Sequence, residues 1–128
     1  MQEKNNPLSP HLQIYRWQIS SLLSITHRIV GVINILAISA ICFWSLFLLL
    51  GAESYEVLNN FFNSFFGKFI AVGLCWTFSF HILNELRHLF WDMGYGFDLK
   101  ISRITGVLAL VGSFVLTILL YLIGKNIF

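Results

Sequence analysis

The stretch IVGVINILAISAICFWSLFLLL, residues 29–50, carries no charged side chain. At a rise of about 1.5 Å per residue, a helix of this length crosses a hydrocarbon core of roughly 30 Å. The stretch ITGVLALVGSFVLTILLYLI, residues 104–123, has the same character, and FIAVGLCWTFSFHIL, residues 69–83, extends to Phe90 with a polar end. Together they predict an all-α membrane protein with three transmembrane helices, at about 25–50, 67–91 and 103–124, in a single anchor domain over 1–128.

The overall composition agrees with a membrane protein. Of the 128 residues, 57% are hydrophobic and 11% are charged, whereas soluble domains carry about 25% charged residues. A soluble globular enzyme and a disordered chain are therefore both excluded. The formal net charge of +2, without a basic cluster, indicates no nucleic-acid partner. The lipid bilayer is the partner that this composition predicts.

The N-terminal residues 1–10 are polar and lack both the apolar core of a secretory signal and the Arg-rich character of a transit peptide. We therefore expect the chain to reach its membrane without a cleaved targeting segment, in a bacterium or after synthesis inside an organelle. Residues 11–28 mix aromatic and basic side chains, which predicts a short interfacial segment that bends into the first span. Residues 51–67 and 92–101 contain helix breakers and are predicted to connect the spans.

Three polar residues share one face of the second predicted span. His81, Glu85 and His88 stand at i, i+4 and i+7, and Gly73 and Thr77 continue this face outward. Histidine inside a membrane is costly and has few roles. His81 is therefore either a core histidine bonded to a neighbouring helix or a haem ligand beside small side chains that leave room for a flat macrocycle. On the residues alone, both interpretations stay open.

A haem held by two histidines needs imidazoles on opposite sides of one iron. His88 lies on the same helix as His81, about 10 Å farther along. His27 is expected at another depth, and His11 precedes the membrane. We therefore expect this chain to hold half of such a site and a partner to hold the other half.

A second polar stripe lies at the entrance to the first span, with members at helical spacing: Ser20, Ser24, His27, Arg28 and Gly31. Arg28 offers a stable cation with several donors, and Ser24 adds a hydroxyl one turn away. The stripe suits the carbonyl oxygens of a quinone, the propionates of a haem or the phosphates of lipids, and an Arg at this depth also serves as a topology anchor. The other polar residues at this end are interpreted as an ordinary interfacial cap of the second span: Arg87, His88, Asp92 and Tyr95.

Two motifs make the sequence recognisable. The first is Pro7-Leu8-Ser9-Pro10-His11 followed by Ser24-Ile25-Thr26-His27-Arg28, which is similar to R-P-x-S-P-H and S-x-x-H-R. The second runs from His81 through Arg87-His88 to Asp92-Met93-Gly94-Tyr95, which is similar to H-x3-G-x-R-H-x3-D-x-G. On these motifs the chain resembles, over its whole length, the cytochrome b subunits of succinate dehydrogenase (respiratory complex II).

This resemblance implies site residues, cofactors and partners. It makes His81 the axial ligand of a haem b that a second membrane-anchor subunit shares, and it places His27 near the haem propionates and the quinone pocket. It gives Ser24 and Arg28 quinone-site positions, with ubiquinone as the substrate. Electrons from succinate would arrive through a flavoprotein subunit and an iron–sulfur subunit, so the chain by itself is expected to be a non-catalytic part of the succinate dehydrogenase (quinone) complex.

The sequence departs from the family motifs at Asn6, which replaces an Arg, at Val30, which replaces a Ser or Thr, and at Glu85. Glu85 replaces a small residue one turn from the haem ligand. A bare carboxylate there would lie near haem propionates of the same sign in a low dielectric. We therefore expect Glu85 to be protonated, to be paired with a cation such as Arg28 or a partner's Arg, or to rotate toward the inner interface.

The sequence also allows functions other than a haem-binding anchor of succinate dehydrogenase. Within the family, the alternatives are a haem-less anchor and an anchor of the fumarate-reductase type. In another class, a small transporter or a structural membrane subunit is the alternative, but transporters usually carry paired half-helices around a central charge, which this chain lacks. The absence of a targeting segment and the Phe-, Ile- and Asn-rich composition favour the mitochondrial inner membrane, with a bacterial plasma membrane as the alternative.

The basic residues predict an orientation. With the N-terminus inside, six of them fall on the inner side: Lys4, Arg16, Arg28, Arg87, Lys100 and Arg103. Only Lys68 and Lys125 fall outside. Lys and Arg in short loops favour the inner side, so the N-terminus is expected inside and the C-terminus outside.

Labelling of introduced cysteines tests this orientation. A membrane-impermeant maleimide added from the outer side should label a cysteine at position 54 and should not label one at position 98, because the two connections lie on opposite sides of the bilayer. The unsubstituted chain serves as the control for Cys42 and Cys75. Labelling of position 98 from the outer side contradicts the predicted topology.

Overall fold

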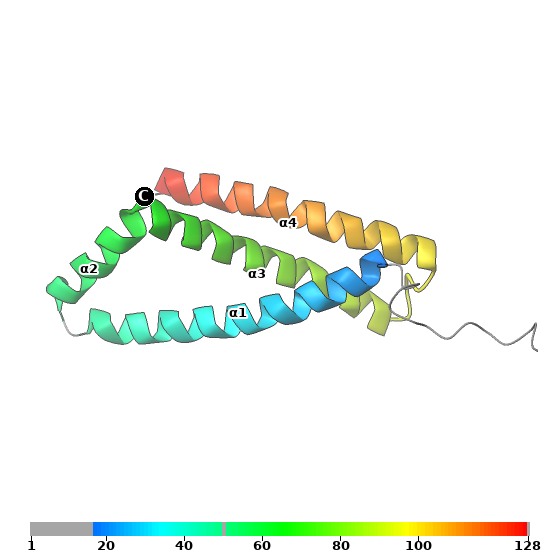
Figure 1. Ribbon diagram of the computed structural model, residues 1–128. Helices are drawn as coiled ribbons and strands as arrows, with labels where there is room; N and C mark the ends of the chain where they lie inside the picture. Colours follow the sequence, from blue (N-terminus) through cyan, green and yellow to red (C-terminus); the bar gives the residue numbers. More distant parts are fainter. Residues whose placement is uncertain (1–16, 50, 128) are drawn as a thin grey trace, which may run out of the picture.

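The computed structural model describes residues 17–49 and 51–127, which form four helices (Figure 1). They are α1 (Ile19–Leu48), α2 (Ala52–Asn63), α3 (Phe65–Asp92) and α4 (Leu99–Ile127). Three of them, α1, α3 and α4, are long and apolar enough to cross a membrane. The predicted all-α fold with three membrane-length helices is confirmed.

The first long helix begins earlier than predicted. Helix α1 runs without interruption from Ile19 to Leu48, whereas the span was expected from about residue 25. Between Ile19 and Arg28 the sequence holds no Pro or Gly that would end a helix. From Ile19 onward the predicted interfacial segment therefore belongs to α1 and does not bend into it. Trp17 and Gln18 precede the helix, and residues 11–16 lie outside the described residues.

The connection between the first two spans contains a helix that the sequence did not predict. Helix α2 has 12 residues, begins after Gly51, whose φ is 119°, and carries Glu53 in its first turn, where a negative charge favours the helix dipole. Ser64 separates α2 from α3: its backbone is extended, and its hydroxyl accepts a hydrogen bond from the Gly67 N–H at 3.1 Å, which caps α3.

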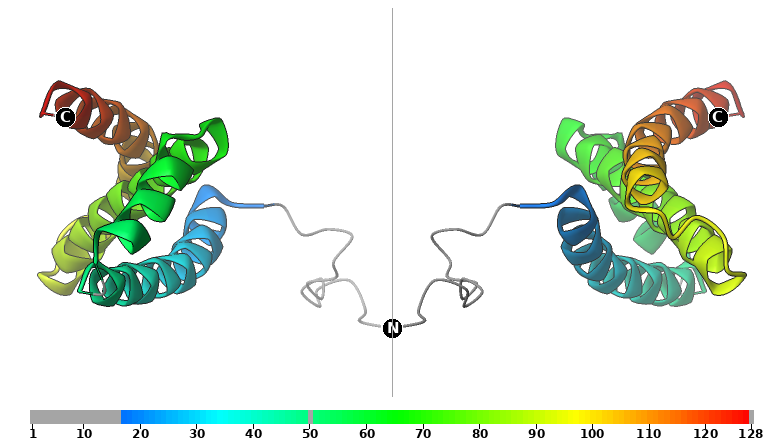
Figure 2. Two further views of the ribbon diagram at one scale, coloured as in Figure 1. Left: turned by 90° about the vertical axis from the view of Figure 1, so that its left-hand side faces the viewer. Right: turned by 90° about the vertical axis from the view of Figure 1, so that its right-hand side faces the viewer.

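The three long helices run alternately up and down, and α3 lies between α1 and α4 (Figures 1 and 2). The start of α1, the end of α3 and the start of α4 meet at one end of the bundle, and α2 joins α1 to α3 at the other end (Figure 1). The first of these ends carries Arg28, Arg87, Lys100 and Arg103. It is the end that the charge pattern predicts to be inside.

Small and polar residues make up the contacts between the helices. Ser79, Phe80 and Asn84 of α3 and Ser113 of α4 are almost completely buried. The indole N–H of Trp76 donates a hydrogen bond to the Ser113 hydroxyl at 3.1 Å, which joins α3 to α4. Small side chains and polar contacts between helices are typical of packing inside a bilayer, where lipid is as apolar as leucine.

The packing of α1 against α4 depends on Gly106. A Cβ at this position would lie 2.5 Å from Leu23 Cδ1 and 3.7 Å from the guanidinium carbon of Arg87. Leu23 is 4% exposed and Arg87 is 7% exposed, so neither side chain has free space into which it can move. Glycine at residue 106 therefore lets α1 approach α4.

A larger side chain at residue 106 should loosen the bundle. We expect Gly106→Leu to lower the stability of the full chain in detergent by about 1–3 kcal/mol, the usual cost of overpacking. Thermal unfolding followed by circular dichroism measures the effect. Gly124→Leu is the matched control on the same helix, because a Cβ at Gly124 has no neighbour within 4 Å among the described residues. Equal melting temperatures for the two variants would contradict the role of Gly106.

Candidate functional site

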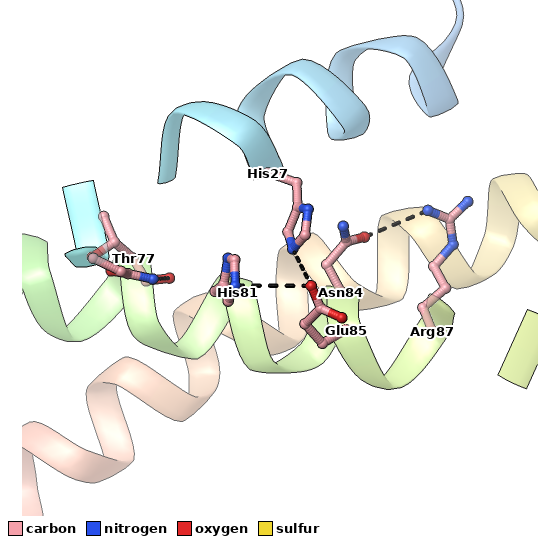
Figure 3. Close-up of polar contacts among 7 residues, drawn as sticks. His27, Thr77, His81, Asn84, Glu85 and Arg87 are labelled. Atoms are coloured by element: carbon pink, nitrogen blue, oxygen red, sulfur yellow. Dashed lines mark hydrogen bonds and ion pairs between the residues drawn. The ribbon is translucent and has the colours of Figure 1, made fainter. Parts of the chain in front are cut away.

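Two histidines and a glutamate meet between α1 and α3. His27 Nε2 lies 3.1 Å from Glu85 Oε1, and His81 Nε2 lies 3.8 Å from the same oxygen. The two imidazole rings are stacked, with centroids 4.3 Å apart and planes inclined by 13°. Figure 3 shows the two rings meeting the Glu85 carboxylate from two helices. We call these three residues the His–Glu cluster.

The cluster forms because α1 and α3 run in opposite directions (Figure 1). His27 follows the first residue of α1 by eight positions, and His81 precedes the last residue of α3 by eleven, which brings the two rings to similar heights. Gly31, one turn after His27, faces the same ring. A Cβ there would lie 3.4 Å from His81 Cε1, in van der Waals contact, so only a side chain longer than that of alanine would press on the ring.

The expectation that His27 lies at a different depth from His81 is therefore wrong. It placed His27 at the very start of the first span, but α1 begins at Ile19 and carries His27 further along the bundle. The expectation that Glu85 is protonated or paired with a cation stays a prediction. The group nearest to its carboxylate in the described part of the chain is the His27 imidazole, at 3.1 Å, which carries a charge only when protonated, and no contact with Arg28 is seen there.

The ledge predicted beside His81 is only partly open. Gly73 is exposed, and a Cβ there would meet no described atom within 4 Å. Thr77 is 6% exposed, and its backbone carbonyl accepts a hydrogen bond from the Asn34 amide of α1 at 3.4 Å. Helix α1 thus covers the part of the ledge nearest His81.

The His–Glu cluster offers donor atoms suited to a metal. Two imidazole nitrogens and a carboxylate oxygen lie within 4.8 Å of one another, and these are common ligand types for transition metals. The stacked rings leave no space for a macrocycle between them, whereas two axial ligands of one haem iron approach it from opposite sides. His27 and His81 therefore do not form a haem pair with each other.

An open cavity of about 410 Å³ lies beside the cluster, between the first turns of α1 and the last turns of α3. Most of its lining residues carry hydroxyl, amide, guanidinium or imidazole groups: Ser20, Ser21, Ser24, Ile25, Asn84, Arg87, His88 and Trp91. We call it the Ser24 cavity. His88 also connects it to the cluster, because its ring meets the His27 ring edge to face with centroids 5.3 Å apart.

Arg87 is held at the wall of this cavity by hydrogen bonds across α3 and α4. Its Nη2 donates to the Ser102 carbonyl and hydroxyl, each at 2.9 Å, and its Nε donates to the Thr105 hydroxyl at 3.2 Å. Its Nη1 donates a longer bond, 3.5 Å, to Asn84 Oδ1, and its guanidinium carbon lies 4.1 Å from the centre of the Trp91 ring. Arg87 therefore does more than cap the end of the second span, because it joins α3 to α4.

Of the two predicted quinone-site residues, Ser24 and Arg28, only Ser24 is among the residues that line this cavity. Arg28 is exposed on α1. Sequence reasoning missed Asn84, which is fully buried at the cavity wall. Its neighbour Arg87 was noticed only as a cap, because nothing in the linear sequence indicates that Ser102 and Thr105 of α4 reach it.

Three membrane-length helices with an imidazole–carboxylate cluster and a polar cavity at one end define an integral membrane subunit with a built polar site, and comparison with known families agrees. The family model described as "Succinate dehydrogenase/Fumarate reductase transmembrane subunit" matches residues 2–120. The chain belongs to this family.

Several relatives with curated names support the assignment. The chain is 44% identical over 115 residues to the succinate dehydrogenase cytochrome b556 subunit of Rickettsia felis, covering 90% of each chain. It is 34% identical to the subunit of the same name in Paracoccus denitrificans, covering 90% of this chain and 88% of the relative. It is also 35% identical to the mitochondrial inner membrane protein SHH3 of Saccharomyces cerevisiae, covering 90% of this chain and 62% of the relative.

Proposed function

We propose that this chain is the haem b-binding membrane-anchor subunit of a succinate:ubiquinone oxidoreductase. By itself it catalyses no reaction; it holds the soluble subunits at the membrane and helps to form the site where ubiquinone is reduced. The observation that carries the proposal is His81, which occupies the ligand position of the family motif on a membrane-length helix and is only 31% exposed at its side chain.

His81 keeps one ring nitrogen without a hydrogen-bond partner among the described residues, as a haem ligand requires, but in this structure that nitrogen faces α1, so α1 would have to give way for a haem to reach it. This nitrogen is the buried Nδ1, while Nε2 lies 3.8 Å from the Glu85 carboxylate. An imidazole that ligates a metal commonly has its other nitrogen oriented by a carboxylate. Haem b, when bound, supplies one-electron transfer, and the residues of this chain that would hold it are His81 and, near its propionates, His27.

A second membrane-anchor subunit would supply the other axial histidine. His27 cannot do so from its stacked position, and His88 lies on the same helix as His81. Large apolar side chains remain exposed along the long helices, among them Ile35, Phe43 and Ile118, and in a bilayer they would face lipid or this second subunit. An inner membrane is the expected location, since the relatives come from bacteria and from a mitochondrion.

The Ser24 cavity is the proposed quinone site of this chain. It opens at the end of the bundle that is expected inside, where an iron–sulfur subunit, with its flavoprotein subunit, would deliver electrons. Ser24 lines the cavity, and the exposed Arg28 lies one turn farther along α1. In the assembled complex, Arg28 would approach the quinone or the neighbouring subunit, where a guanidinium with several donors stabilises developing negative charge on a quinone oxygen.

Replacement of His81 tests the haem assignment. In the assembled complex, His81→Leu should abolish or shift the low-spin bis-histidine absorbance spectrum, because one axial nitrogen is lost. Leu89→Ala, at an exposed position on the same helix, is the matched control and should leave the spectrum unchanged. An unaltered spectrum in His81→Leu rules out His81 as the ligand. Absence of haem from the wild-type complex would favour the haem-less alternative, with Glu85 beside His81 as the reason.

Replacement of Arg28 tests the quinone assignment. Arg28→Leu should lower the rate of succinate:ubiquinone reduction about tenfold or more, since hydrogen bonds from charged groups contribute about 1.5–3 kcal/mol. Succinate oxidation by a soluble dye should persist, because it bypasses the membrane site. Arg103→Leu, another exposed Arg at the same end of the bundle, should leave both activities unchanged. Full quinone reduction in Arg28→Leu would contradict the assignment.

A further inference from the structure

The side-chain amide of Asn84 carries a hydrogen-bond donor that no described residue uses. The residue is fully buried, with 0% exposure, and its Nδ2 has no hydrogen-bond partner among the described residues. Buried amide groups are nearly always hydrogen-bonded, because leaving a donor unpaired away from water is costly. An unpaired donor at the wall of a cavity is therefore a reason to look for a ligand there.

Arg87 sets the orientation of the Asn84 amide by donating a hydrogen bond to its oxygen. Arg87 Nη1 donates to Asn84 Oδ1 at 3.5 Å, and the other nitrogens of Arg87 are bound by Ser102 and Thr105. A guanidinium only donates, so it must face the carbonyl oxygen of the amide, and the NH2 group turns away from it. Figure 3 shows the Asn84 nitrogen on the side of α1, which forms the other wall of the Ser24 cavity.

The cavity suits a small molecule that presents acceptor oxygens on a flat apolar ring. Its volume of about 410 Å³ falls within the usual range for small-molecule sites, about 300–1,000 Å³. The hydroxyl of Ser24 and the amide of Asn84 supply donors, and Ile25 and Trp91 supply apolar and aromatic surface. A quinone head group carries two carbonyl acceptors and no donor, which matches this lining.

We propose that Asn84 is a quinone-binding residue: its Nδ2–H donates a hydrogen bond to a carbonyl oxygen of a quinone head group in the Ser24 cavity, with Arg87 as the residue that positions the amide. This inference rests on the proposed function and adds to it a residue that the family motif does not specify. Asn84 binds and orients the quinone, and no proton leaves the amide.

A lipid phosphate fits the same cavity less well. A phosphate group is best bound by cations with free donors, but four hydrogen bonds to Ser102, Thr105 and Asn84 already engage most of the five Arg87 donors. The unused donor is a neutral amide, which suits a neutral carbonyl. A lipid that occupied this cavity would therefore compete with the quinone and would not explain the unpaired nitrogen.

The test uses the assembled complex in membranes and a short-chain ubiquinone as the probe. Asn84→Ala removes the donor, and Asn84→Asp removes it while keeping the size of the side chain and an oxygen that faces Arg87. Both variants should raise the KM for the quinone about five- to tenfold, the usual worth of one hydrogen bond. The dye-linked oxidation of succinate and the haem spectrum should stay unchanged.

Asn34 provides a matched control. It is also buried, at 5% exposure, but its Nδ2 already donates to the Thr77 carbonyl at 3.4 Å. Asn34→Ala should lower the melting temperature and leave the KM for the quinone unchanged. A similar rise in KM in Asn34→Ala would overturn the proposal, because it would trace the effect to general loosening of the helices.

Two further outcomes would overturn the proposal. One is a wild-type KM in Asn84→Ala and Asn84→Asp. The other is a raised KM that returns to the wild-type value when the complex is moved into vesicles of phosphatidylcholine alone, because that would assign the cavity to an anionic lipid. In both cases the wild-type complex still reduces the quinone, whereas a wild-type complex that reduces none would refute the proposed function itself.

Discussion

The Arg87 guanidinium, buried between α3 and α4, is the interaction on which this end of the molecule depends. A charge with 7% exposure is tolerable only where its donors are satisfied, and Ser102 and Thr105 of α4 satisfy most of them. This requirement fixes α4 against α3. Gly106 beside it is needed for a separate reason, because a Cβ there would clash with Leu23 of α1. Arg87 also sets the direction of the Asn84 amide, so the packing of α4 and the proposed binding of a quinone both depend on one buried cation.

The His–Glu cluster depends on a second constraint, the close crossing of α1 over α3. Gly31 faces the His81 ring, and the ring of His27 stacks on it at 4.3 Å. Glu85 then meets both imidazoles, so the carboxylate that departs from the family motif has a basic group 3.1 Å away. Helix α1 thus brings a histidine to the acidic residue that lies beside the proposed haem ligand.

The three spans were predictable because bilayer thickness and helix rise together require about twenty apolar residues, and 29–50 and 104–123 supply them without a charge. Helix α2 was not predictable in the same way, since its 12 residues are amphipathic and lie between two glycines. Ser24 and His81 were singled out from helical spacing and from their motifs. The contact of His27 with His81 was missed because it depends on where α1 begins, and the burial of Arg87 was missed because it depends on the docking of α4.

Two consecutive residues of α3, Asn84 and Glu85, contact different parts of the site. Asn84 is fully buried and lies at the Ser24 cavity, while the side chain of the next residue, Glu85, is 56% exposed and contacts the imidazoles. Successive residues on a helix point about 100° apart, so a single turn can line the proposed quinone site and also support the proposed haem ligand. The edge-to-face contact between His88 and His27 joins the two. A quinone bound in the cavity would therefore lie next to the His–Glu cluster that holds the proposed haem ligand.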